Sequence, residues 1–231
     1  MFLSCGLIIF NQLSGGAALG YFGGSVAFPS VTEGDADDVL TVNVYLSLVQ
    51  VIFTLIAGQL IGKYGFRTFM QEGIRVIIIA LLLVSFIELF VPDLHIFTVI
   101  LTFIQMVGFS LSYGPCCFVL VTCIMHDIWL PSVILWVFIF IHGIAIPTFV
   151  ETLGIGALSF IYFILQIIGL LYISGYLIEP SGKTRAEYYE EFRKGMFPNP
   201  VRYLKNRLSG GKKERNDKPG DIEMELLEHE K

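Results

Sequence analysis

Six apolar stretches, each of the about 20 residues that a membrane-spanning helix needs, constrain the fold of this chain more than any other feature. They lie near residues 5–28, 40–61, 72–91, 96–124, 131–149 and 155–178. Only 15% of the residues are charged, whereas roughly a quarter are charged in a soluble domain. We therefore expect an all-α membrane protein with a six-helix transmembrane bundle over residues 1–178.

Charge differs in sign between the loops that separate these stretches. The loop at 62–72 holds Lys63 and Arg67, and the segment after residue 178 is rich in Lys and Arg, whereas the loop at 30–38 holds only acidic charge. Lys and Arg are enriched in the cytoplasmic loops of membrane proteins. With six crossings, both termini are expected in the cytoplasm. The first stretch is too long for a cleavable signal and has no basic leader.

The chain after the last stretch divides into two parts. Residues 179–208 are expected to form a cytoplasmic segment, in which 187–197 (EYYEEFRKGMF) mix charge with aromatic residues at helical spacing. That pattern predicts a short helix at the membrane interface. Residues 209–231 consist mainly of Gly, Pro and charged residues, which predicts a disordered, charged tail.

Glycine and proline interrupt two of the six stretches. The first contains GGAALGYFGG (15–24) and the fourth contains GFSLSYGPCC (108–117). Each of these begins a group of three stretches, which indicates a 3+3 repeat. In secondary transporters, interrupted spans at corresponding positions of two repeats point to the transport site.

Adjacent amides occur in the first stretch at Asn11 and Gln12. A buried amide without a hydrogen-bond partner is costly in a bilayer, so both must face protein or water. An amide offers a donor and an acceptor without charge, which suits an uncharged solute that bears hydroxyl groups. Amides also tie neighbouring helices together in membrane bundles. The residues alone leave both alternatives open, and they do so again for Gln50 in the second stretch.

Small residues lie along one side of the first stretch. Gly16, Gly20 and Gly24 are spaced by four, which allows helix backbones to approach closely. We favour this packing role over a flexible gate hinge. In the fourth stretch, Pro115 lacks a backbone donor and predicts a bend about Gly114.

Ionisable and thiol groups within the stretches are few. Glu88 is expected at the interface, whereas His142 lies deeper and is expected either to be satisfied within the bundle or to face the pathway. The cysteines are interpreted as structural thiols, because they show no zinc-like spacing: Cys5, Cys116, Cys117 and Cys123. We recognise no hydrolytic triad, phosphate loop or metal cluster in the sequence. We therefore expect no enzyme, no cofactor or metal, and no nucleic-acid partner.

Four motifs occur in the order in which one transporter family carries them. NQLSGGAALGYF (11–22) resembles the QQLSG…YY segment in the seventh helix of sugar porters of the major facilitator superfamily, and GKYGFRT (62–68) is similar to that family's G-R-R loop between helices eight and nine. YGPCCF (113–118) resembles the tenth-helix G-P-x-P-W segment. EPSGKTRAEY (179–188) is similar to the P-E-T-K-G-R-T signature after helix twelve.

The resemblance implies the C-terminal six-helix half of a twelve-helix facilitator fold that moves monosaccharides, with a hexose expected, by alternating access across the plasma membrane. The positions that match sugar-contacting residues of the family are Asn11, Gln12, Gln50, Phe109, Gly114 and Phe118. Tyr21 is a further aromatic residue expected near the solute. Gly65 and Arg67 match the cytoplasmic loop motif, and Gly16, Gly20, Gly24 and Pro115 are expected to serve gating or packing.

The chain also departs from the family pattern. The departures are Asn11 for the first glutamine, Ala17 for an asparagine, Phe66 for an arginine, Cys117 for a proline, Phe118 for the tryptophan and Cys123 for an acidic residue. They motivate a second hypothesis, in which the protein is a membrane sensor or assembly partner that does not transport. Because one half does not enclose a cavity on both sides, the expected partners besides lipid and solute are a missing N-terminal half or a second copy. Of these two alternatives, we favour a fragment of a longer protein over a half-size protein that dimerises.

Overall fold

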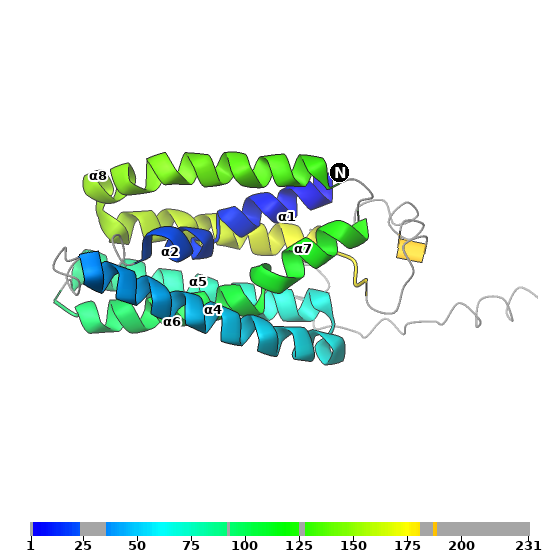
Figure 1. Ribbon diagram of the computed structural model, residues 1–231, viewed down its shortest axis with the longest axis horizontal. Coiled ribbons are helices and arrows are strands. Elements are labelled where there is room, and N and C mark those ends of the chain that lie inside the picture. Colours follow the sequence, from blue (N-terminus) through cyan, green and yellow to red (C-terminus); the bar gives the residue numbers. More distant parts are fainter. Residues whose placement is uncertain (1, 24–35, 92, 125–127, 181–186, 189–231) are drawn as a thin grey trace, which may run out of the picture.

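The computed structural model of the protein describes residues 2–23, 36–91, 93–124, 128–180 and 187–188, and these contain helices and no strand (Figure 1). The helices are α1 (Phe2–Gln12), α2 (Gly16–Phe22), α4 (Ala36–Tyr64), α5 (Phe66–Phe90), α6 (His95–Leu111), α7 (Tyr113–Ile124) and α8 (Trp129–Tyr176). Four segments of the described chain are long and apolar enough to cross a membrane: Asp37–Tyr64, Phe66–Phe90, Ile96–Cys123 and Trp129–Tyr176. The expected all-α membrane architecture is confirmed at this level.

The outer surface of the bundle is apolar and part of its interior is polar. Large apolar side chains of α4 are exposed, among them Leu48 and Leu55, whereas Thr102, Gln105 and Ser110 of α6 are buried. Lipid solvates apolar side chains but offers no hydrogen bonds, so polar groups gather between helices. This distribution suits a protein that is surrounded by lipid.

The first apolar stretch is divided in the structure. We expected one helix over 5–28, but α1 ends at Gln12 and α2 begins at Gly16. Gly15 has a φ of +74°, a left-handed conformation that glycine adopts without a steric penalty. The break therefore depends on one of the glycines that made the stretch unusual in the sequence. Residues 24–28 lie outside the described part.

The fourth stretch is divided as well. We expected one bent helix over 96–124, but α6 ends at Leu111, and Ser112, with φ −106° and ψ −84°, separates it from α7. Pro115 lacks an N–H, and its ring clashes with the carbonyl of the residue four positions earlier, which is Leu111. The break lies at the point where that clash would fall in a continuous helix.

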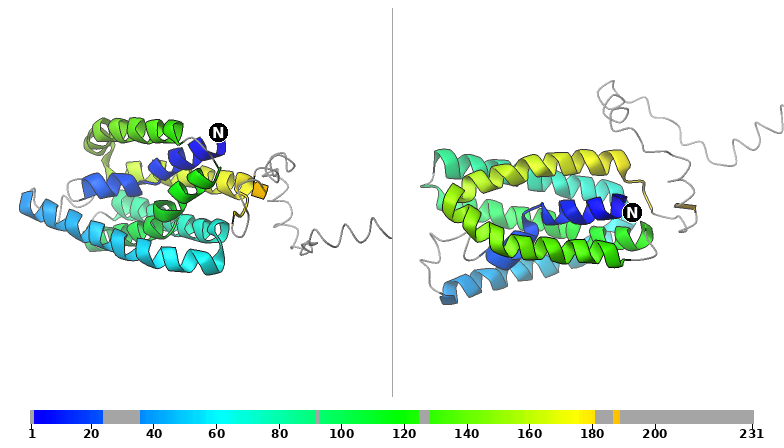
Figure 2. Two further views of the ribbon diagram at one scale, coloured as in Figure 1. Left: turned by 45° about the vertical axis from the view of Figure 1, so that its right-hand side comes forward. Right: turned by 90° about the horizontal axis from the view of Figure 1, so that it is seen from above.

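The fifth and sixth stretches are joined without a loop in α8. Its 48 residues contain one non-helical residue, Gly154, with φ +79° and ψ 167°. A straight helix of this length would measure about 72 Å, more than twice the hydrocarbon thickness. Instead, α8 doubles back at this kink, and α1 lies between its two parts (Figures 1 and 2).

The loop that we expected at 62–72 is a single residue. Helix α4 continues to Tyr64, and α5 begins at Phe66 after Gly65, whose φ is +81°. Helix α5 packs against α6 and α8, and α1 packs against α8. The α5–α6 crossing is close, since a Cβ on Gly108 would lie 3.2 Å from the carbonyl oxygen of Gly73.

Most charges of the described residues lie towards the two ends of the bundle, whereas Arg75 and Glu72 pair with each other within α5. Lys63 and Arg67 lie at the end where α8 finishes, which is also the end where α1 starts (Figure 1). The acidic residues Asp37, Asp38 and Glu151 belong to the opposite end, where α4 starts and α8 turns. The predicted interfacial helix (187–197) and tail (209–231) lie outside the described residues, apart from positions 187 and 188.

Candidate functional site

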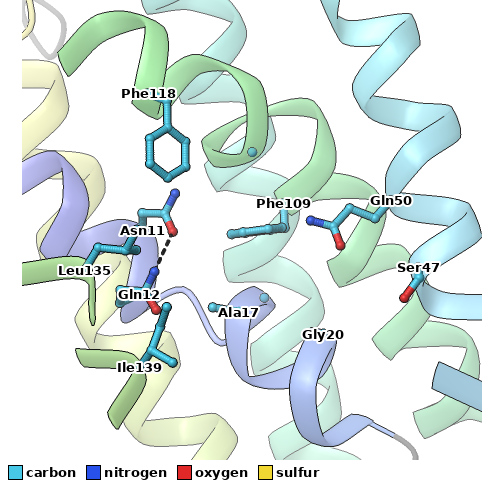
Figure 3. Close-up of a pocket in the computed structure, with 12 residues that line it drawn as sticks. Asn11, Gln12, Ala17, Gly20, Ser47, Gln50, Phe109, Phe118, Leu135 and Ile139 are labelled. Atoms are coloured by element: carbon cyan, nitrogen blue, oxygen red, sulfur yellow. Dashed lines mark hydrogen bonds between the residues drawn. The ribbon is translucent and has the colours of Figure 1, made fainter. Parts of the chain in front are cut away.

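A cavity of about 400 Å³ lies beside the two helix breaks (Figure 3). Ligand pockets in proteins generally have volumes of about 300–1,000 Å³. Its wall is built by the following residues of α1, α2, α4, α6, α7 and the first part of α8: Asn11, Gln12, Gly16, Ala17, Gly20, Ser47, Gln50, Phe109, Gly114, Phe118, Leu135 and Ile139. No charged side chain belongs to this wall among the described residues. The cavity therefore suits an uncharged ligand.

Two amides form one polar side of the cavity. Asn11 and Gln12 occupy the last turn of α1 and are each 3% exposed. The amide nitrogen of Asn11 donates to the Tyr113 carbonyl oxygen at 3.4 Å, and that of Gln12 donates to Asn11 Oδ1 at 3.4 Å. Gln12 Oε1 accepts no hydrogen bond from any described residue. A buried acceptor in this state calls for a partner beyond the described residues, such as a bound solute.

The polar side chains of α4 lie across the cavity from these amides. Ser47 and Gln50 are three positions apart, so they project from one face of the helix. Figure 3 shows the Gln50 amide on the far side of Phe109 from Asn11 and Gln12. The cavity therefore has hydrogen-bonding groups on two sides.

Aromatic side chains complete the wall between the polar groups. Phe109 is 5% exposed, and its ring lies against Gly16, where any Cβ would collide with it. Phe118 is 49% exposed and lies beside Asn11 (Figure 3). Phe109 is thus a fixed part of the wall, whereas Phe118 has room to move.

The structure brings together the residues that the resemblance assigned to solute binding. The residues Asn11, Gln12, Gln50, Phe109, Gly114 and Phe118 all line the cavity. Gly16 and Gly20 also line it, whereas Pro115 does not. Gly24 and the side chain of Tyr21 lie outside the described residues.

Sequence reasoning missed three residues of the wall. Ser47 carried a signal that we did not use, because it is one helical turn from Gln50. Leu135 and Ile139 are ordinary apolar residues of an apolar stretch, so nothing in the sequence marks them. Ala17 was noted only as a departure from the family pattern, yet it lines the cavity.

The ionisable candidates lie away from the cavity. His142 is buried, with its ring edge-on to Phe138 and Tyr162, so it is enclosed within the bundle. Glu88 is half-buried and accepts a hydrogen bond from Thr98 Oγ1 at 2.7 Å. In the described part of the chain, no group of three or more His, Cys, Asp or Glu side chains could hold a metal ion.

The loop motif forms a contact between distant parts of the chain. The carboxylate of Glu179 accepts hydrogen bonds from the backbone N–H groups of Phe66, at 2.9 Å, and Arg67, at 2.7 Å. The Arg67 guanidinium donates to the Ser174 carbonyl oxygen at 2.7 Å. An anion at a helix N-terminus satisfies free N–H groups and is favoured by the helix dipole. Glu179 therefore caps α5.

Comparisons with known proteins agree with the motif assignments. Residues 1–192 match the family described as "Sugar (and other) transporter". Similar proteins of Bacillus subtilis (strain 168) include the putative metabolite transport protein YwtG, 25% identical over 197 residues, and an arabinose-proton symporter, 24% identical over 187 residues. These alignments cover 81% and 78% of this chain, but 43% and 40% of the relatives. The chain spans about two fifths of the length of the curated relatives it matches.

Proposed function

Because the chain belongs to the sugar (and other) transporter family, the sugar porters of the major facilitator superfamily, we propose that it carries a monosaccharide, in the first instance a hexose, across the membrane by alternating access. The solute binds in the cavity between Asn11 and Gln12 on one side and Gln50 on the other. The proposal applies to this chain together with a second six-helix unit that closes the open side of the cavity.

The observation that carries the proposal is the unpartnered acceptor of Gln12. Its Oε1 atom accepts no hydrogen bond from the described residues, although the side chain is buried in the wall of an uncharged cavity. A sugar hydroxyl donates a hydrogen bond without bringing charge, and another hydroxyl of the same sugar can accept one from the Gln50 amide. The exchange of water for such a solute keeps these polar groups satisfied.

Aromatic groups support the choice of a sugar over other uncharged solutes. A pyranose ring has a polar rim of hydroxyl groups and an apolar C–H face. Phe109 and Phe118 supply apolar surfaces for that face, and the amides of Gln12 and Gln50 serve the rim. Pockets of this kind use a few polar groups to orient a ligand on an otherwise apolar wall.

The proposal includes six membrane crossings arranged as two groups of three. Four crossings would come from the first stretch, α4, α5 and the α6–α7 pair, and two from the parts of α8 on either side of Gly154. The helix breaks at Gly15 and Ser112 lie beside the cavity and bring the ends of α1, α2, α6 and α7 to its wall. A second six-helix unit, from a longer chain or a second copy, would cover the partly exposed Gln50 and Phe118.

The test is the substitution Gln12→Leu, with Gln71→Leu as the matched control. Gln71 is also a buried amide, but it bonds Ser174 Oγ at 3.1 Å and does not line the cavity. Radiolabelled D-glucose and L-arabinose serve as probes, the second because a relative is named for it. Loss of one hydrogen bond predicts roughly five- to tenfold weaker binding for Gln12→Leu, at unchanged protein abundance.

Two results would count against the proposal. In a system where the wild type is shown to transport the sugar, equal binding and uptake by Gln12→Leu and the wild type would refute the role of this cavity. Binding of sugar without counterflow in vesicles would favour the sensor hypothesis, because counterflow requires the solute to cross the membrane in both directions.

A further inference from the structure

The break between α1 and α2 leaves backbone groups without their usual helical partners. In a continuous helix, the Ser14 N–H would donate to the Phe10 carbonyl oxygen, four residues earlier. Here it donates to the Asn11 carbonyl oxygen instead, at 3.2 Å. The Phe10 carbonyl therefore needs a donor from elsewhere, since an unsatisfied backbone group at membrane depth is costly.

Two glutamines from distant parts of the chain supply donors at this break. Gln166 Nε2, from the second part of α8, donates to the Phe10 carbonyl oxygen at 3.2 Å. Gln105 Nε2, from α6, donates to the Ser14 carbonyl oxygen at 3.3 Å. Gln166 is 0% and Gln105 4% exposed. The two amides thus hold the backbone near the end of α1, at Phe10, and within the break, at Ser14.

Ser14 completes the arrangement from within the break. Its hydroxyl donates to the Asn11 carbonyl oxygen at 2.6 Å and accepts the Gly16 N–H at 3.2 Å. The approach of Gln105 also depends on Gly15, since a Cβ there would lie 2.9 Å from Gln105 Nε2. The backbone groups of the break thus find hydrogen-bond partners in nearby side chains, and Gly15 leaves the space that Gln105 needs.

We propose that Gln105 and Gln166 are positioning residues that hold this break in shape and thereby keep Gly16 and Phe109 in place beside Asn11 and Gln12 in the wall of the cavity. Neither glutamine lines that cavity, so each acts through the end of α1. Without these donors, a continuous helix through residues 10–16 satisfies the same backbone groups. Such a helix rotates the residues after Gln12 and removes Gly16 from its place against Phe109. This inference rests on the proposed solute-binding role of Gln12.

The experiment compares Gln105→Leu and Gln166→Leu with the control Gln71→Leu in the purified full chain. Hydrogen–deuterium exchange over residues 10–16 is measured without ligand, and equilibrium binding is measured with radiolabelled D-glucose and L-arabinose. We expect altered exchange in this segment and roughly five- to tenfold weaker sugar binding for both variants. Gln71→Leu, which removes an inter-helix amide elsewhere, should leave both readouts unchanged.

A double-mutant cycle separates positioning from general stability. If Gln166 acts through Gln12, then Gln166→Leu should weaken sugar binding in the wild type but have little further effect in a Gln12→Leu background. The inference would be overturned if the losses in sugar binding of Gln12→Leu and Gln166→Leu added up in the double variant. It would also be overturned if Gln105→Leu and Gln166→Leu showed the same hydrogen–deuterium exchange over residues 10–16 as Gln71→Leu. An effect of Gln12→Leu without an effect of either glutamine would overturn it while leaving the proposed function intact.

Gln105→Leu decides the matter if Gln166→Leu does not accumulate as folded protein. Gln105 lines a second cavity of about 50 Å³ together with Ser159 and Tyr162, so a leucine has room there. Unchanged exchange and binding in Gln105→Leu would then refute the role of the pair.

Discussion

Single residues decide the geometry of the broken first stretch, and Gly15 is the clearest case. An alanine at this φ of +74° costs about 1–2 kcal/mol, and its Cβ would press on the Gln105 amide. We expect Gly15→Ala to lower the thermal stability of the purified protein. Gly20→Ala is the control, because among the described residues a Cβ there would meet only Met106 Cε, at 3.9 Å. Equal melting temperatures for the two variants would contradict this explanation of the break.

Gln50 provides a second prediction at the residue scale. Its amide lines the cavity from α4, whereas Gln59 on the same helix is exposed and does not line it. We expect Gln50→Ala to weaken sugar binding roughly fivefold through the loss of one hydrogen bond. Gln59→Ala should bind as the wild type does. The assignment of α4 to the site would be refuted if both variants retained full affinity in an equilibrium binding assay.

The capped start of α5 is the element whose stability is easiest to test. Its first two N–H groups are satisfied by Glu179, and removal of an N-terminal capping side chain typically costs about 0.5–2 kcal/mol. We expect Glu179→Ala to destabilise the protein by about that amount in thermal unfolding. Glu151→Ala is the control, since Glu151 is an exposed acidic residue near the kink of α8. Equal stability of the two variants would show that the cap contributes nothing.

The membrane orientation belongs to the scale of the whole molecule. Lys63 and Glu151 lie at opposite ends of the bundle (Figure 1), and basic ends of membrane proteins face the cytoplasm. In a background with serine at the half-buried Cys5 and Cys123, we expect Glu151→Cys to react with an impermeant maleimide in intact cells. Lys63→Cys should react only after permeabilisation. The reverse pattern would invert the orientation, and a Glu151→Cys variant that stays unreactive even after permeabilisation would contradict the two crossings of α8.

The sequence alone determined the class of the molecule. Its apolar stretches predicted helices that cross a membrane, because a bilayer imposes a length and an apolar composition that can be read without any knowledge of packing. Four ordered motifs predicted the family, and the comparisons confirmed it. The cost of amides in apolar stretches drew attention to Asn11, Gln12 and Gln50 but left a helix-tying role open, and their match to the sugar-contacting positions of the family made them candidate site residues.

Only the tertiary structure decided that the stretches marked by Gly and Pro are divided into separate helices, and what holds the break at Gly15. In the sequence, Gln105 and Gln166 do not differ from other amides in apolar stretches. Their role at the break can be inferred only once the carbonyl oxygens of Ser14 and Phe10 are known to lie within hydrogen-bond distance of them. The extent of α8 was equally hidden, because its reversal takes place at one glycine and needs no loop. The apolar pattern of a sequence indicates which segments face lipid or protein. It does not indicate which side chain bonds a carbonyl oxygen that a helix break leaves free, because that side chain can be 156 positions away, as Gln166 is from Phe10.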